Sequence, residues 1–137
     1  MLSTNQPLQR TIFLTGAFFA CTAVIIGAMG SHNLKPHLTD DQFYSFDTGV
    51  RYQMYHAFAI LITGILLQFI HSKHRIPYSF VSFVTGILFF SGSLYLTATR
   101  ELMQIGYPKW FFLITPAGGI FFILGWIQLK AGVLLKK

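Results

Sequence analysis

Residues 11–30 read TIFLTGAFFACTAVIIGAMG, a run of 20 residues without a charged side chain. Three more uncharged runs follow at 52–70, 77–99 and 110–129, and they contain 19, 23 and 20 residues. A helix rises about 1.5 Å per residue, so about 20 residues cross the hydrocarbon core of a bilayer. The runs lack the alternation typical of barrel strands. The sequence therefore predicts four membrane-spanning helices, at about 11–30, 51–70, 77–99 and 110–130.

The composition of the chain also indicates a lipid environment. Of its 137 residues, 53% are hydrophobic and only 10% are charged, whereas soluble domains usually carry about 25% charged residues. The length fits a single domain over residues 1–137. The net charge of +6 does not indicate nucleic-acid binding, because the basic residues lie between and beside apolar runs.

One alternative for the first run is a cleaved signal, because Arg10 precedes it and Ala20-Cys21 resembles a lipoprotein cleavage site. Phe18 and Phe19 fit such a site poorly, and the apolar run continues beyond Cys21. We therefore expect a membrane span here, with Cys21 as a small buried residue.

The positions of Lys and Arg predict the orientation, since both are retained on the cytoplasmic side of a membrane. Four spans place six basic residues on the side of the termini and four on the other side. The first group is Arg10, Lys73, Arg75, Lys130, Lys136 and Lys137, and the second is Lys35, Arg51, Arg100 and Lys109. We expect a multi-pass protein of the cell inner membrane with both termini in the cytoplasm.

The first outer loop contains a predicted helix start. Thr39 is a suitable N-cap, and Gln42 occupies the third helical position, as in a capping box. Phe43, Tyr44 and Phe46 follow and would give this helix an aromatic side that rests in the headgroups. The predicted fold class is therefore all-α: an integral membrane four-helix bundle with a short interfacial helix in the first outer loop.

Small residues form one face of the first span and allow close helix packing in lipid. They are Gly16, Ala20, Ala23, Gly27 and Gly30, at spacings of 4, 3, 4 and 3. The main interpretation is a packing seam inside the bundle. The same face could instead serve self-association, in a homo-oligomer.

Polar or helix-distorting residues of the four antiparallel spans converge in the outer leaflet and predict a polar pocket there. They are His32, Arg51, Tyr52, Gln53, His56, Ser91, Ser93, Tyr95, Thr115 and Pro116. Asp47 and Arg51 have the spacing of an ion pair across one helical turn. Pro116 would free a carbonyl one turn earlier, which His56 or Ser93 could satisfy.

His56 is the one histidine within a span, and two roles remain open for it: a structural hydrogen bond between helices, or ligand and proton handling. No metal site is expected, because His32 and His37 lack a sulfur or acidic partner at ligand spacing. His71 and His74 are three residues apart, but a basic interfacial turn accounts for them better.

These motifs together resemble a known family. GAMGSHNLK at 27–35, TGVRYQMYHA at 48–57, FSGSLY at 90–95, ITPAGG at 114–119 and GW at 125–126 are similar to the family called domain of unknown function 423. That family includes transmembrane protein 256-like proteins and small membrane proteins of the YgdD and YwdK type. Met29 and Ser31 depart from its usual Phe and Ala. The resemblance implies a small multi-spanning inner-membrane protein and supplies no mechanism.

The residues favour a non-enzymatic function without a cofactor, because all the acidic residues lie near water, none is within a span, and no catalytic constellation results. We expect a homo-oligomer or an accessory subunit of a larger membrane complex, with the lipid bilayer as its environment. The alternative is a component of a small-solute, lipid or ion transporter or channel. That alternative needs a polar path across both leaflets, and the inner halves of the spans are poor in polar residues.

Overall fold

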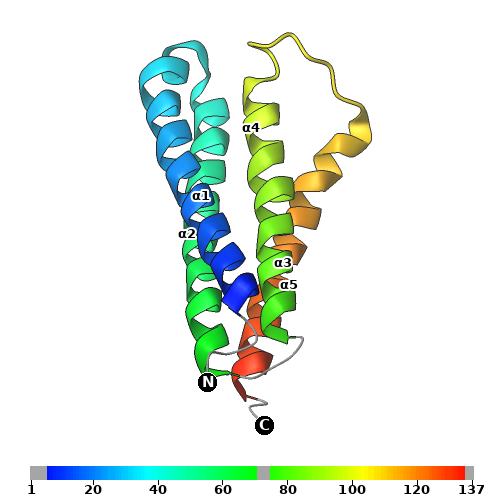
Figure 1. Cartoon of the computed structure of the whole chain (residues 1–137). Coiled ribbons are helices and arrows are strands. Elements are labelled where there is room, and N and C mark those ends of the chain that lie inside the picture. Colours follow the sequence, from blue (N-terminus) through cyan, green and yellow to red (C-terminus); the bar gives the residue numbers. More distant parts are fainter. Residues whose placement is uncertain (1–5, 71–74, 135–137) are drawn as a thin grey trace.

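The structure, a computed structural model, describes residues 6–70 and 75–134 (Figure 1). All regular elements in these ranges are helical: α1 (Gln6–Met29), the π-helix η1 (Gly30–Leu34), the 3-10 helix η2 (Lys35–His37), α2 (Asp40–Phe69), α3 (Arg75–Gly86), the π-helix η3 (Ile87–Ser91), α4 (Gly92–Thr99), the 3-10 helix η4 (Lys109–Leu113) and α5 (Ile114–Leu134). His71, Lys73, His74, Lys136 and Lys137 lie outside the described residues.

The predicted all-α membrane fold is confirmed. Within the described ranges, four helical stretches are long and apolar enough to cross a membrane: Gln6–His37, Asp40–Phe69, Arg75–Thr99 and Lys109–Leu134. Helix α1 packs along α2, and α3 packs along α5, while α2 joins the two pairs by contacts with α3, η3 and α4. The beginning of α1 and the end of α5 lie at one end of the bundle, opposite the loop at 100–108 (Figure 1).

The separate interfacial helix in the first outer loop was a wrong prediction. The capping box itself is present, since Gln42 N–H donates to Thr39 Oγ1 and Thr39 N–H donates to Gln42 Oε1. However, the helix that starts there is α2, which continues for 30 residues to Phe69. The aromatic residues of its first turns do not share one exposed side, because Phe46 is buried against Gly30 while Tyr44 is exposed.

The small residues of the first span form a seam between α1 and α2. A Cβ atom added to Gly16 would lie 2.8 Å from Leu61, and one added to Gly30 would lie 2.5 Å from the Phe46 ring. Ala23 is fully buried and Ala20 is half-buried, and Gly27 faces Val50. This small-residue face is therefore covered by α2 of the same chain.

The seam between α3 and α5 interlocks glycines with phenylalanine rings. Gly86 lies against the Phe122 ring, and Gly125 lies against the Phe83 ring. Gly118 approaches the backbone of Phe90 so closely that an added Cβ would lie 2.3 Å from its nitrogen. Such close backbone approach is the usual means of helix association in lipid.

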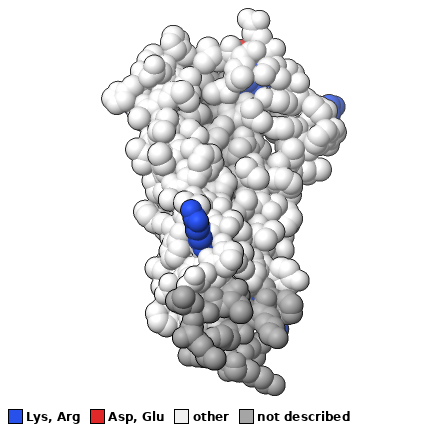
Figure 2. Space-filling model, viewed as in Figure 1, with Lys and Arg blue, Asp and Glu red and all other residues white. Residues whose placement is uncertain are grey.

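The outer surface of the bundle is apolar. Leu14, Phe18, Val24 and Ile25 of α1 are all exposed, and Figure 2 shows a face with little charge between the two ends. Cys21 is exposed as well, so its expected burial was wrong. The reason is geometric: the seam with α2 contains positions 16, 20, 23 and 27, and position 21 lies off it.

Gly118→Ala should lower the free energy of unfolding by about 1–3 kcal/mol, because its Cβ would overlap the Phe90 backbone. The matched control is Gly119→Ala, whose Cβ would lie 3.9 Å from the nearest atom and should be tolerated. Denaturant unfolding in detergent, followed by circular dichroism, measures both variants. Equal stability of the two would contradict the close approach of α5 to η3.

Candidate functional site

The structure divides the predicted outer pocket into separate groups of residues. Gln53 and Tyr95 belong to one hydrogen-bonded group, Tyr52 and His56 to a second, and Ser93 and Thr115 to a third. The remaining four residues, His32, Arg51, Ser91 and Pro116, make no side-chain hydrogen bond to any of these groups. The sequence placed these residues in one half of the bundle, but it did not indicate this division.

Gln53 joins three helices. Its Nε2 donates to the carbonyl oxygen of Phe19 at 2.9 Å and to Thr22 Oγ1 at 2.8 Å, both on α1. Its Oε1 accepts from the Tyr95 hydroxyl of α4 at 2.8 Å. The residue is 4% exposed, so its amide is isolated from solvent. Both ends of the amide are therefore satisfied within the protein.

His56 joins α2 to α5. Its ring stacks on Phe122, with 3.5 Å between the centroids and 8° between the planes. Trp126 Nε1 donates to His56 Nε2 at 3.3 Å, and His56 Nδ1 lies 2.8 Å from the carbonyl oxygen of Tyr52. An indole N–H only donates and a carbonyl only accepts. These partners therefore assign the proton to Nδ1 and leave Nε2 as the acceptor.

A groove of about 490 Å³ opens beside His56. It is lined by Tyr52, His56, Phe90, Pro116, Gly119, Ile120, Phe122, Ile123 and Trp126. Tyr52 and Trp126 remain 39% and 47% exposed, so the groove is open on the outside of the bundle. Its volume lies in the range of small-molecule sites, about 300–1,000 Å³. We call this feature the aromatic groove.

Ser93 and Thr115 join α4 to the start of α5, with 2.6 Å between their hydroxyl oxygens. Ser93 also donates to the carbonyl oxygen of Phe90 at 3.0 Å, which leaves Thr115 as the donor between the two hydroxyls. Ser91 is fully buried, and its hydroxyl has no partner among the described residues.

The expected bonds from His56 or Ser93 to a carbonyl before Pro116 are not formed. Pro116 is the third residue of α5, which continues directly from η4. The His56 and Ser93 side chains bond instead to the carbonyls of Tyr52 and Phe90.

Arg51 lies on the surface. Its Nε is 3.0 Å from Asp47 Oδ2 in an ion pair one helical turn apart, and both side chains are nearly half exposed. The guanidinium also lies over the Tyr44 ring, 5.6 Å from its centroid. His32 is exposed on η1. Neither Arg51 nor His32 lines the aromatic groove.

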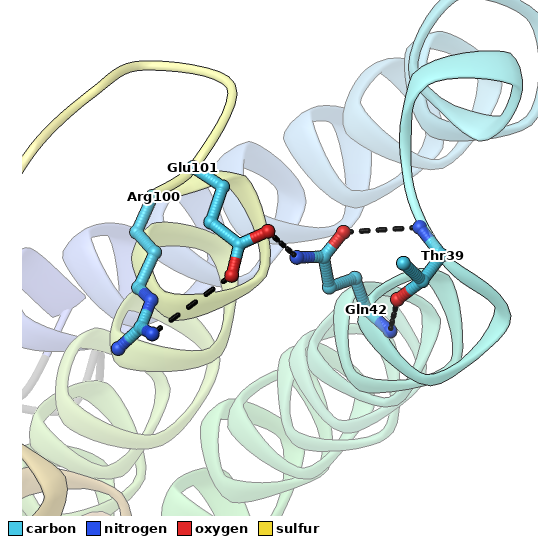
Figure 3. A network of polar contacts seen from close by, with 4 residues as sticks. All are labelled: Thr39, Gln42, Arg100 and Glu101. Atoms are coloured by element: carbon cyan, nitrogen blue, oxygen red, sulfur yellow. Dashed lines mark hydrogen bonds and ion pairs between the residues drawn. The ribbon is translucent and has the colours of Figure 1, made fainter.

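Polar contacts at the end of the bundle opposite the termini tie the start of α2 to the loop at 100–108 (Figure 3). Gln42 Oε1 accepts from Thr39 N–H, and Gln42 Nε2 donates to Glu101 Oε2 at 2.9 Å. Arg100 Nη2 lies 3.9 Å from the other carboxylate oxygen of Glu101. Gln42, the second member of the capping box, thus also holds the segment that follows α4.

Three residues of these groups were missed by sequence reasoning: Thr22, Phe122 and Trp126. Phe122 lies four residues after Gly118 and three before Gly125, so its place on the packing face of α5 was available from spacing. Trp126 lies one further turn along the same helix. Thr22 gave no such signal, because its role depends on how α1 is placed against Gln53.

Comparison with known proteins identifies the family. The profile of the family described as "Protein of unknown function (DUF423)" matches residues 26–119. This chain belongs to that family. Family members similar to it include the UPF0382 membrane protein YwdK of Bacillus subtilis, 32% identical over 88% of this chain and 94% of the relative. A UPF0382 membrane protein of Haemophilus influenzae is 35% identical over 93% of this chain and 94% of its own length.

A third relative is a UPF0382 membrane protein of Staphylococcus aureus, 35% identical over 88% of this chain and 93% of its own length. No solved structure gives a significant match. The family profile covers Gln53 and His56 but ends at residue 119, before Phe122 and Trp126 of the DUF423 chain.

His56→Ala should lower the free energy of unfolding by about 2–3 kcal/mol, because it removes the stacking on Phe122 and leaves the Trp126 N–H without its acceptor. Membrane insertion should be unchanged. Unfolding of the purified variant in detergent measures the loss. The matched control is His32→Ala at an exposed position, which should change stability by less than about 0.5 kcal/mol. An unchanged His56→Ala protein would contradict a structural role.

Proposed function

We propose that this protein is a non-enzymatic binding subunit in the membrane, which holds the apolar part of a lipid in the aromatic groove. The observation that carries this proposal is the groove itself: it is open on the outside of the helix bundle and its walls are aromatic and aliphatic. A lipid chain is the apolar ligand that reaches such an opening directly from a bilayer.

The contacts of His56 support a binding role over a catalytic one. Both ring nitrogens are engaged, one by the Trp126 indole and one by the Tyr52 carbonyl. A general acid or base needs a nitrogen within reach of the reacting proton. The four acidic residues belong to the first turns of α2 and to the loop after α4, away from His56. We therefore infer that the protein does not act as an enzyme.

We further propose a location in the cell inner membrane, with both termini in the cytoplasm. The support is the bias of Lys and Arg toward the side of the termini. Because the groove binds without reacting, we infer that the chain works in a homo-oligomer or as an accessory subunit of a larger complex. The bound lipid would then stabilise its contact with a partner.

The polar contacts in the inner half of the bundle support transport less well than they support a binding role. Thr63 donates to the carbonyl oxygen of Ala59, and Ser79 donates to that of Ile76. Ser82 pairs with Gln128 at 3.0 Å, which joins α3 to α5. These hydroxyls are all buried and bonded to protein, so among the described residues they line no open polar path.

Native mass spectrometry of the protein extracted gently from its own membranes should find a stoichiometric lipid adduct. Gly119→Leu should reduce that adduct several-fold, because the leucine would fill the aromatic groove without meeting a close neighbour. Gly92→Leu is the matched control, since nothing lies within 4 Å of its Cβ position and it is outside the groove. An adduct that persists in Gly119→Leu would refute binding in the groove. The same spectra record the oligomer and any co-purifying subunit.

Thiol labelling tests transport and orientation together, in a Cys21→Ala background. Thr63→Cys and Ser82→Cys should resist a water-soluble maleimide, since both positions are buried. Gln104→Cys, in the exposed loop after α4, should react in right-side-out membrane vesicles and serves as the positive control. Labelling of Thr63→Cys would favour a transport path. Labelling of Gln104→Cys only after vesicle disruption would reverse the proposed orientation.

A further inference from the structure

A second cavity lies at the opposite end of the bundle, between the start of α1 and the end of α2. Its volume is about 690 Å³. The lining divides into polar residues (Gln6, Gln9, Arg10 and Gln68) and apolar ones (Pro7, Phe13 and Leu14). Guanidinium and amide donors thus share one cavity with apolar side chains.

A hydrogen bond between α1 and α2 fixes the depth of this cavity. Gln9 Nε2 donates to the carbonyl oxygen of Gly64 at 3.1 Å, so Gln9 and Arg10 are level with Gly64. Gly64 precedes Phe69, the last residue of α2, by five positions, or about 7–8 Å along the axis. In a spanning bundle, Arg10 therefore lies near the boundary between headgroups and acyl chains, and its long side chain can extend toward the headgroups.

The charge distribution favours an anion at this cavity. All four acidic side chains of the chain, Asp40, Asp41, Asp47 and Glu101, belong to the other end of the bundle. Arg10, Arg75 and Lys130 lie at this end and are exposed. The Arg10 guanidinium thus has no carboxylate side chain of its own chain to pair with here. An arginine fork is well suited to phosphate oxygens.

We propose that this cavity binds the headgroup of an anionic phospholipid. Arg10 holds the phosphate, the amides of Gln6 and Gln68 add hydrogen-bond donors, and an acyl chain of the same molecule packs against Phe13 and Leu14. Basic pockets on the cytoplasmic side of membrane helices recognise lipid headgroups in this way. The site is separate from the aromatic groove and does not depend on the function proposed for it.

The full chain is reconstituted into nanodiscs that contain equal amounts of phosphatidylglycerol and phosphatidylcholine. Native mass spectra then measure how much of each lipid the protein retains. Arg10→Gln should reduce the preference for phosphatidylglycerol about fivefold, or about 1 kcal/mol, because it removes the charged residue that lines the cavity. Lys130→Gln removes the same charge at the same end but outside the cavity, and should leave the preference within about twofold. Arg10→Lys should retain most of the preference. An equal effect of Arg10→Gln and Lys130→Gln would overturn the proposal, as would no effect.

A competition experiment distinguishes a lipid ligand from a soluble phosphate ester. Excess glycerol phosphate should not displace phosphatidylglycerol from the unmodified protein, because it lacks the chain that packs against Phe13 and Leu14. Displacement by glycerol phosphate would show that the cavity takes free phosphate esters and would overturn the lipid assignment.

Discussion

The structure depends on one constraint of the bilayer: a polar group inside it is costly unless it finds a partner within the protein. Gln53 meets this constraint for three helices, through two donor contacts to α1 and one acceptor contact to Tyr95 of α4. An unpaired amide in an apolar medium costs several kcal/mol. The same contacts therefore fix how α1, α2 and α4 are placed against each other.

Close backbone packing holds α5 against α3 and η3. Glycines of α3 and α5 receive phenylalanine rings from the facing helix, and Gly118 lies against the backbone at Phe90. This packing brings Phe122 under the His56 ring and Trp126 to its Nε2 atom. The aromatic groove is thus a consequence of how α5 docks, rather than of any single residue. Filling it should affect ligand binding more than folding.

The two candidate binding sites differ in chemistry and in position. The aromatic groove offers apolar walls in the half of the bundle that contains His56, and the Arg10 cavity offers cationic and amide groups at the end near the termini. A lipid chain suits the first, and an anionic headgroup suits the second. Both proposals take the ligand from the membrane itself.

The sequence by itself determined the membrane class, the four spans, the family and the Thr39 cap, because run length, charge content and local capping chemistry are all properties of neighbouring residues. It also placed Gln53 and His56 in the same half of the bundle. Only the tertiary structure decided that they belong to different groups, that α2 extends without a break and that neither His56 nor Ser93 bonds to a carbonyl before Pro116. Those outcomes depend on the rotation and depth of each helix against its neighbour, which hydrogen bonds between distant residues and glycine contacts fix.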